Sequence, residues 1–462
     1  MIVLLYVADA LRSDFLSCYG FSKDTSPNID ELAKDAVLYE NAYSTTTWTK
    51  PAAASMLTGR YPRELRMLHQ MDALPEYEYL LTSLLKQKGY YNLAASANAF
   101  FSPDFGFGGF DEFFVLQREK DLVEKGRQAK PTSLKKDRVL EKISIDKLIV
   151  PHSQDINRVI YPLLRNRSMP NRFIMAWSAD THAPYYVKGE RSFFGNSSDD
   201  FIMERDVNRG NLEKVRSLYC DMIRYNDHTF GELMTMLKRE GLYDDSLIIF
   251  TSDHAECFGE HSSILGRFVV GHGEMPYEEL IRIPLIVKYP RNALAGSRCR
   301  RAVQLTDIYP TIVKSCNIDS GGIADESLPL DLEQGGLHDD RIIFVESQLQ
   351  RKGTYFAAVK MGNKKLIKAD KNLYLGWNIK RVAKSILERL SIPAEQLYDL
   401  GSDPKEQSDI KATNRQDLDT LLGMYHHIRK RCDQRAEEIK EKRREPLAED
   451  IKEQLKALGY VD

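Results

Sequence analysis

The chain is a succession of short apolar runs separated by amphipathic stretches. The first run, "IVLLYVAD", is apolar until it reaches an aspartate, and four similar runs lie at residues 91–98, 172–180, 246–253 and 283–289. A run without polar alternation is typical of a strand that is buried on both faces of a parallel sheet. Helical patterns lie between the runs, notably at residues 211–240 and 307–316. This alternation predicts an α/β fold with a doubly wound, mixed or parallel sheet.

Two parts of the chain depart from this alternation. Residues 118–170 are rich in charge and poor in aromatic side chains, which indicates an insertion or lid within a catalytic α/β domain at residues 1–340. Short strand patterns predict a smaller α+β subdomain at residues 341–410, with Gly362 and Asn363 as a hairpin turn. Residues 411–462 read as a highly charged helical tail, which is either an amphipathic helix packed on the body or a contact within a homo-oligomer.

Composition excludes some classes of function. The 462 residues are 42% hydrophobic, which is enough for a substantial core. Their net charge is only −2, so the chain lacks the basic field that nucleic-acid binding requires. Its six scattered cysteines include no Cys-x-x-Cys pair, which predicts free thiols. No apolar run approaches the roughly 20 residues of a transmembrane helix, and the first residues do not resemble a signal peptide. We therefore expect a cytoplasmic protein without a transmembrane segment.

Candidate chemistry begins where two of the apolar runs end in an acid. Asp9 closes the first run, and Asp253 closes the fourth, with His254 directly after it. In open α/β sheets, ligands bind beyond the carboxyl ends of the strands, so these side chains are expected to meet. Each aspartate alone could equally be a helix cap. The two together, next to a histidine, favour a divalent metal such as Zn²⁺ or Mn²⁺.

The segment "TTTWTKPAAASMLTGRYP" supplies a candidate nucleophile. Pro51 suits the first position of a helix, which places Thr49 just ahead of a helix N-terminus, where free N–H groups attract an anion. A threonine hydroxyl is a weak nucleophile, and a bound metal is one way to activate it. Thr49 beside the metal of the two aspartates is therefore a coherent attacking group. Lys50 is a candidate contact to an oxygen of the bound anion, and Trp48 is a candidate wall of the pocket.

Seven segments, in order, resemble the sulfatase-like branch of the alkaline phosphatase superfamily. They run from residue 1 to about residue 410 and read VADALRSDFLSCYG, TSPNIDELAKDAVLYENAYS, TKPAAASMLTGRYP, HAPY, GLYDDSLIIFTSDHAECFGEH, GHGEMPYEELIRIPLIVKYP and QLYDLGSDPKE. Because so many segments match in family order, the resemblance is specific. It implies the α/β fold of that superfamily and a metal-dependent enzyme that acts on sulfate or phosphate esters.

The departures from the family pattern concern the nucleophile and the metal. Similar sulfatases carry a Cys or Ser that matures to formylglycine in a C/S-x-P-x-R motif, whereas here Thr49 stands at the first position and Ala53 at the last. Formylglycine cannot be made from Thr, so the aldehyde-hydrate mechanism is closed to this chain. Ala10 stands where similar sulfatases have a second acid that holds calcium. Losing an oxygen ligand while keeping His254 favours one Mn²⁺ or Zn²⁺ over Ca²⁺.

Threonine nucleophiles occur in related nucleotide pyrophosphatases/phosphodiesterases, phosphoethanolamine transferases and lipoteichoic acid synthases, where the Thr forms a phospho-enzyme. By this resemblance Thr49 is the nucleophile. Phosphorus is favoured over sulfur as the atom attacked, because hydrolysis of a sulfated Thr would again need attack at sulfur. His182 and His272 resemble substrate-side histidines that bind the anion or protonate the leaving group. Asn98 resembles an asparagine that contacts a phosphate oxygen. In an alternative interpretation, each of these residues only caps or orders a loop.

A second metal near Asp180, His182 and His272 is a further alternative, although the two-metal relatives have a wider Asp–His spacing. Because of this spacing we expect one metal, with the two histidines and Asp180 on the substrate side. One divalent ion in turn suits a singly charged ester. His261 is expected to orient a metal ligand rather than to bind the metal.

We therefore predict a metal-dependent hydrolase of phosphodiesters or phosphonate monoesters that works through phospho-Thr49. The substrate is a small-molecule or glycan-linked phosphoester or sulfoester. Three alternatives stay open: a sulfatase-family sulfuric ester hydrolase, a transferase that passes a phospho group to a glycan or lipid acceptor, and a non-catalytic binding scaffold. The scaffold is disfavoured because every group that one-metal chemistry needs is present.

Overall fold

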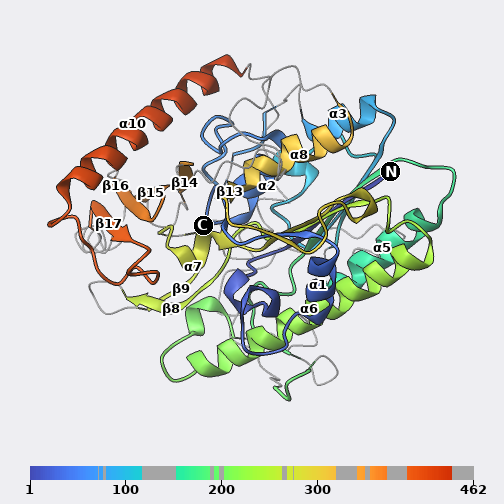
Figure 1. Cartoon of the computed structure of the whole chain (residues 1–462), viewed down its shortest axis with the longest axis horizontal. Helices are drawn as coiled ribbons and strands as arrows, with labels where there is room; N and C mark the ends of the chain where they lie inside the picture. The colour runs from blue at the N-terminus through green and yellow to red at the C-terminus, as the bar shows by residue number, and fades with distance from the viewer. Residues whose placement is uncertain are drawn as a thin grey trace, which may run out of the picture.

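The structure is a computed structural model that describes most of the chain. A large central sheet is covered by helices, and a smaller sheet lies beside it under a long C-terminal helix (Figure 1). The described residues are 1–70, 72–75, 80–116, 152–187, 192–196, 202–262, 268–273, 275–318, 341–348, 354–371 and 393–439.

Eight strands form the central sheet, and it is mixed. In order across the sheet they are β12 (Ser297–Cys299), β2 (Val37–Tyr39), β11 (Leu285–Lys288), β7 (Leu247–Thr251), β1 (Ile2–Ala8), β6 (Arg172–Ser178), β4 (Tyr91–Ser96) and β5 (Glu112–Val115). Strand β1 pairs in parallel with both β7 and β6, whereas β11 runs antiparallel to β7 and β2. The predicted doubly wound, mixed or parallel α/β sheet is confirmed.

Helices cover both faces of the central sheet (Figure 1). One face carries α1 (Pro27–Lys34), α5 (Ser153–Arg165) and α6 (Leu212–Arg239), and the other carries α2 (Thr49–Thr58), α3 (Leu81–Gln87) and α8 (Ile308–Ser315). Successive side chains of β1 point to opposite faces, so Leu5 packs under α2 while Leu4 and Tyr6 pack under α1 and α6. Because both faces are covered, the strand has to be apolar at every position.

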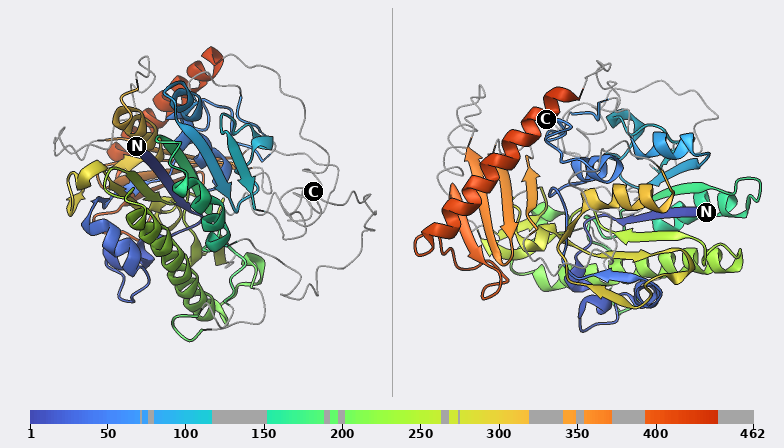
Figure 2. Two further views of the ribbon diagram at one scale, coloured as in Figure 1. Left: turned by 90° about the vertical axis from the view of Figure 1, so that its right-hand side faces the viewer. Right: turned by 45° about the horizontal axis from the view of Figure 1, so that its top comes forward.

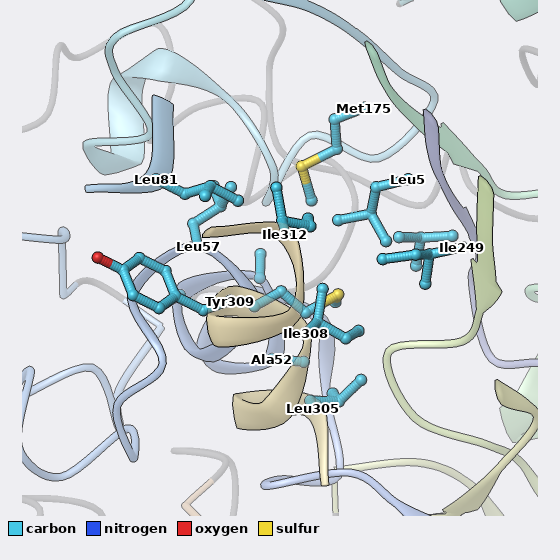
Figure 3. Packing of buried hydrophobic residues seen from close by; sticks show 14 of the residues in the cluster. Leu5, Ala52, Leu57, Leu81, Met175, Ile249, Leu305, Ile308, Tyr309 and Ile312 are labelled. Carbon is cyan, nitrogen blue, oxygen red and sulfur yellow. The ribbon is translucent and has the colours of Figure 1, made fainter. Parts of the chain in front are cut away.

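The core under α2 fixes the position of that helix. Figure 3 shows Leu57 of α2 beside Leu81 of α3, with Ile312 of α8 between them and Leu5 of the sheet, and these four side chains are fully buried in one cluster. Burying a side chain of this size stabilises the fold by about 1.5–3 kcal/mol. The N-terminal end of α2, where Thr49 lies, is therefore held firmly against the edge of the sheet.

Helix α2 begins earlier than the sequence predicts. Thr49 is its first residue, Trp48 precedes it, and Pro51 is the third residue rather than the first. The N–H groups of a first helical turn have no partner within the helix, so a proline at the third position removes no hydrogen bond. Thr49 itself belongs to this first turn.

The segment predicted as an insertion or lid, residues 118–170, divides into two parts. Residues 117–151 lie outside the described residues. Residues 153–165 form α5, and its Ile156, Ile160 and Leu164 are completely buried against the sheet. The insertion prediction is wrong for this helix, because its apolar residues recur every three or four positions among charged ones, as a core-covering helix requires.

The C-terminal part is a four-stranded antiparallel sheet with a helix across it (Figure 2). Its strands are β14 (Ile343–Ser347), β15 (Thr354–Met361), β16 (Lys364–Lys371) and β17 (Glu395–Asp399). The pairing of Met361 with Lys364 confirms the predicted turn at Gly362–Asn363. Helix α10 (Arg415–Glu438) packs on this sheet through a buried stripe of Leu418, Leu421, Tyr425, Ile428 and Cys432.

Short elements link the two sheets. They are β3 (Ala42–Tyr43), β10 (Arg282–Ile283) and β13 (Val303–Gln304), the β8–β9 hairpin (Cys257–Ser262 and Phe268–Gly271), and α7 (Glu278–Ile281). All six cysteines are free thiols, as predicted. Among the described helices, none is long and apolar enough to cross a membrane.

Candidate functional site

Asp9, Asp253 and His254 meet at one edge of the central sheet. Asp9 follows β1 and Asp253 follows β7, its parallel neighbour, so both side chains leave the sheet at the same end. His254 Nε2 lies 3.6 Å from Asp9 Oδ1 and 3.3 Å from Asp253 Oδ2. All three residues are fully buried. The structure therefore brings together the three predicted metal ligands, which are called the metal cluster from here on.

Each carboxylate of the metal cluster has one oxygen that accepts hydrogen bonds and one that accepts none among the described residues. Asp9 Oδ2 accepts hydrogen bonds from Asn98 Nδ2 at 2.5 Å and from Trp177 Nε1 at 3.0 Å. Asp253 Oδ1 accepts one from the backbone N–H of Ala10 at 3.1 Å. Asp9 Oδ1 and Asp253 Oδ2 have no hydrogen-bond partner among the described residues, and these are the two atoms that face the imidazole. Because buried polar atoms are normally paired, this arrangement fits a divalent cation.

The electrostatics of the metal cluster agree with this fit. Burial raises the pKa of Asp253 well above its usual range, and the neighbouring Asp9 carboxylate raises it further. Burial lowers the pKa of His254 well below its usual range, and its Nδ1 donates to the backbone oxygen of Ala255 at 2.9 Å. The ring is therefore neutral and turns the lone pair of Nε2 toward the carboxylates, which is how histidine binds zinc. One nitrogen and two carboxylate oxygens suit Zn²⁺ or Mn²⁺.

Thr49 lies directly beside the metal cluster. Its Oγ1 is 3.5 Å from His254 Nε2 and accepts a hydrogen bond from Asn98 Nδ2 at 3.2 Å. Because the same amide also donates to Asp9, Asn98 ties the hydroxyl to the carboxylate. The N-terminus of α2 thus presents the predicted nucleophile to the predicted metal ligands.

Two further histidines border the metal cluster. The ring centroid of His272 lies 4.4 Å from that of His254 and 4.8 Å from that of His182. His272 Nδ1 is 3.3 Å from Glu204 Oε1 and 3.4 Å from Glu256 Oε1. Burial lowers the pKa of His272, but the two carboxylates outweigh it and raise the pKa to about 10. In the absence of a bound cation, His272 is therefore positively charged at neutral pH.

Lys50 does not reach this site. Its Nζ donates to the backbone oxygens of Gln70, at 2.6 Å, and of Asp72, and lies 4.4 Å from the ring centroid of Phe105. The side chain is completely buried, which lowers its pKa to about 7. The predicted contact from Lys50 to a bound anion is not formed, because successive residues of a helix point in different directions and this one points into the core.

Asp180 is likewise occupied by the chain itself. It accepts hydrogen bonds from His152 Nδ1 at 2.9 Å, Ser178 Oγ at 3.0 Å and Asn226 Nδ2 at 3.1 Å. Burial raises the pKa of Asp180, but these donors, led by His152, outweigh it and lower the pKa. Asp180 therefore joins β6 to α5 and α6 rather than to a substrate, and Glu204 takes the place predicted for it beside His182 and His272.

Sequence reasoning missed Trp177, Glu204 and Glu256. Glu256 is completely buried and follows His254 by two residues in "SDHAECFGEH", so its place in the segment of two predicted metal ligands was a readable signal. Glu204 lies in the 3₁₀ turn η7 (Glu204–Asp206), in a stretch without periodicity. It reaches His272 because residue 271 is a glycine: a Cβ there would lie 2.5 Å from Glu204 Oε2.

His261 stands apart from the metal cluster. Its Nε2 lies 3.0 Å from Glu279 Oε2, and its ring stacks on Tyr277 with the centroids 3.6 Å apart. Within the described part of the chain, His261 contacts Glu279 and Tyr277 rather than a residue of the metal cluster, so it is assigned to the packing around α7 instead of the predicted orientation of a metal ligand.

The sequence matches known proteins over most of its length. A family model described as Sulfatase matches residues 2–318. The chain is 24% identical to the N-acetylgalactosamine-6-sulfatase of Rattus norvegicus, over 91% of this chain and 83% of that protein. It is 23% identical to the arylsulfatase of Clostridium perfringens, over 68% of this chain and 75% of that protein.

Solved structures show the same fold. The phosphonate monoester hydrolase of Agrobacterium radiobacter superposes with a TM-score of 0.67 at 19% identity, over 94% of this chain and 95% of that one. Ps i-CgsB in complex with k-i-k-neocarrahexaose superposes with a TM-score of 0.61 at 20% identity, over 92% of each chain. At these identities the likeness concerns the fold alone, whereas the family model covers well over half of the sequence. The chain belongs to the Sulfatase family and is a hydrolase that acts on ester bonds.

Proposed function

We propose that this protein hydrolyses esters whose tetrahedral centre carries a single negative charge, with a sulfate monoester as the first candidate. Thr49 is the nucleophile, and Asp9, Asp253 and His254 hold a divalent cation, Zn²⁺ or Mn²⁺. The observation that carries the proposal is the position of Thr49 Oγ1, 3.5 Å from the nitrogen that both unpartnered carboxylate oxygens face. Sulfate esters come first because the relatives matched along the chain are sulfatases.

The residues of the site divide the reaction between them. A cation held by the metal cluster would supply Lewis-acid chemistry, which favours ionisation of the Thr49 hydroxyl and attracts an oxygen of the ester. Asn98 orients the hydroxyl, whose oxygen attacks the sulfur while the bond to the leaving alcohol breaks. His272 places positive charge beside the anion, where it stabilises the developing negative charge and protonates the leaving alcohol, and His182 lies next to it. The proton that leaves the Thr49 hydroxyl balances the one that His272 gives up.

Breakdown of sulfated Thr49 needs a second attack at sulfur, by water, which releases sulfate and restores the hydroxyl. This second attack is the demanding step for a sulfate ester and is the reason that the sequence favours phosphorus.

A phosphodiester or phosphonate monoester is the second candidate. Such an ester also carries one negative charge, so the same side chains compensate it. Thr49 favours this class, because it cannot become formylglycine and because phospho-Thr is a competent intermediate. Ala10 and Ala53 also depart from the usual sulfatase pattern. A transferase would share the first displacement and differ only in the acceptor.

The test compares p-nitrophenyl sulfate, bis-p-nitrophenyl phosphate and a phenylphosphonate ester with Zn²⁺ or Mn²⁺. For the preferred substrate, Thr49→Ala should lower kcat about 10³-fold or more, as loss of a nucleophile does. Thr49→Ser, which keeps a hydroxyl, should retain measurable turnover. Thr58→Ala removes a hydroxyl from the other end of α2, where it bonds only within that end of the helix, and should change little.

The preferred ester separates the candidates. Dominant sulfate turnover supports the first, and dominant turnover of the diester or phosphonate supports the second. Mass spectrometry of quenched enzyme should find the transferred group on the peptide that contains Thr49. Tight binding of these esters without turnover of any of them would refute both candidates and leave the binding scaffold.

A further inference from the structure

A second group of potential metal ligands lies beside the metal cluster. The ligand atoms of His182, Glu204 and His272 all lie within 4.8 Å of one another. They come from three separate segments, which follow β6, form η7 and follow β9. The proposed function uses His272 as a source of positive charge and places His182 beside the anion. It gives no role to Glu204, nor to the Glu256 carboxylate next to it.

Each of the two histidines has one ring nitrogen that is available to a ligand. His182 Nδ1 donates to the backbone oxygen of Ala183 at 2.6 Å, so the lone pair of its Nε2 stays free for coordination. His272 Nδ1 has no hydrogen-bond partner among the described residues, although it faces Glu204 and Glu256. This combination, one ring fixed by a backbone carbonyl and another aimed at carboxylates, is typical of metal-binding histidines.

The Glu256 carboxylate shares the single imidazolium of His272 with Glu204. The Glu256 side chain is completely buried, and within the described part of the chain neither of its oxygens has a hydrogen-bond partner. Two carboxylates around one imidazolium leave an excess of negative charge when both are ionised, and burying that excess is costly unless a further cation compensates it. Glu204 reaches the same place only because Gly271 leaves room for it, since a Cβ at that position would meet its carboxylate at 2.5 Å.

We propose that His182, Glu204 and His272 bind a second divalent cation, Zn²⁺, with the Glu256 carboxylate as its nearest further oxygen donor. Two imidazole nitrogens and one carboxylate oxygen are a common zinc ligand set, and they leave a coordination position open for a substrate oxygen. This cation takes the place of the proton that His272 otherwise carries.

The consequence for substrate choice rests on the proposed function. The rings of His254 and His272 lie 4.4 Å apart, so the two cations are neighbours. Two neighbouring cations compensate a dianionic phosphate monoester, which one cation compensates poorly. Zinc loading of the second site therefore extends the substrates from singly charged esters to phosphate monoesters.

The test counts bound zinc, which needs no turnover. Protein stripped with a chelator is titrated with Zn²⁺ in a calorimeter, and the zinc that stays bound is measured by elemental analysis. Wild type should bind two ions per chain. Glu204→Gln should weaken one of them at least about tenfold and keep the other, and His182→Asn should act in the same way. Asp253→Asn should remove the other ion and keep this one.

A matched control comes from α6. His228 and Glu232 lie 3.8 Å apart on its exposed surface, and Glu232→Gln should leave the zinc count at two. A wild type that binds a single ion, lost in Asp253→Asn, would overturn the proposal, as would a Glu204→Gln protein that still binds two ions tightly. A protein that binds two ions and hydrolyses no ester would refute the proposed function instead. A wild type that binds no more than one ion and still turns over a singly charged ester would refute only the second site and would leave the proposed function intact.

Discussion

Two buried charge clusters in this molecule differ in the source of their counter-charge. In the metal cluster, Asp9 and Asp253 face a neutral His254. In a second cluster, called the junction cluster here, Lys365 Nζ lies 2.9 Å from Glu278 Oε1 and 2.8 Å from Glu406 Oε1. The backbone N–H of Glu278 also donates to Glu406 Oε2 at 2.7 Å. The junction cluster joins β16 of the C-terminal sheet to α7 and to the loop that follows β17.

The junction cluster has a lysine of the chain as its counter-charge, whereas the described residues supply no lysine or arginine to the metal cluster. Burial raises the pKa of Glu278, but Lys365 outweighs this and lowers it. The pKa of Asp253 is not lowered in this way by a lysine or an arginine, because none of the described lysines and arginines pairs with either aspartate of the metal cluster. The difference teaches that burial of charge alone does not mark a functional site. A functional site is marked by buried charge that has no oppositely charged partner within the chain.

The largest effect should come from Asp253→Asn. The amide removes a ligand of the cation, so we expect turnover of the preferred ester to fall about 10³-fold or more. In the presence of a chelator, the free energy of unfolding should not fall, because the change also removes repulsion between two buried carboxylates. Asp245→Asn, at an exposed turn, is the control and should change neither quantity. A loss of several kcal/mol of stability without metal would show that Asp253 has a structural role.

Lys365→Met should have the opposite effect: it should lower the stability of the fold and leave turnover almost unchanged. It leaves two buried carboxylates without their cation, which typically costs about 3–5 kcal/mol of unfolding free energy. Turnover per folded molecule should stay within about threefold of wild type, since the lysine has no contact with Thr49 or with the metal cluster. Urea unfolding and an activity assay on the same samples measure both.

The neighbouring lysine provides the control for that experiment. Lys364 is partly exposed and pairs with Asp399 at 2.9 Å, so Lys364→Met should cost less than about 1 kcal/mol. Equal losses in the two variants would mean that the junction cluster is no more than a surface ion pair. A large loss of turnover in folded Lys365→Met would show that the C-terminal sheet takes part in the site.

The part of the site that the sequence predicted is the part built on parallel strands. Asp9 and Asp253 end adjacent strands, and the carboxyl ends of parallel strands meet at one edge, so their meeting follows from the pattern alone. Thr49 follows from the helix start that "TKP" marks, although α2 begins two residues before the expected position. In each of these cases, regular backbone geometry carries the side chain to its place.

The rest of the site could not be predicted, because it depends on where individual side chains point, and the sequence pattern does not determine this. Lys50 is adjacent to Thr49 in sequence, but its long side chain turns into the core to donate to Gln70 and Asp72. Glu204 lies in an irregular segment and reaches His272 only because of Gly271. A single sequence shows neither where a flexible side chain points nor which loop lies against a site.

The smallest effect concerns the pH dependence of the junction cluster. Burial raises the pKa of Glu406 to about 7 despite the lowering by Lys365, and Glu278 adds to the rise. The folded protein therefore binds more protons than the unfolded chain between about pH 4.5 and about pH 7, so stability from this group is present below that window and is lost as the pH rises through it.

Glu406→Gln cannot titrate and isolates this contribution. The unfolding free energy of wild type minus that of Glu406→Gln should fall by about 2 kcal/mol between about pH 5 and about pH 8. Urea unfolding in a chelator at both pH values measures the difference. A difference that grows with pH would mean that Glu406 is ionised throughout, held by Lys365 as firmly as Glu278 is. In that case the junction cluster would be a fully charged triad, and its contrast with the metal cluster, where a missing cation leaves one carboxylate reluctant to ionise, would become sharper still.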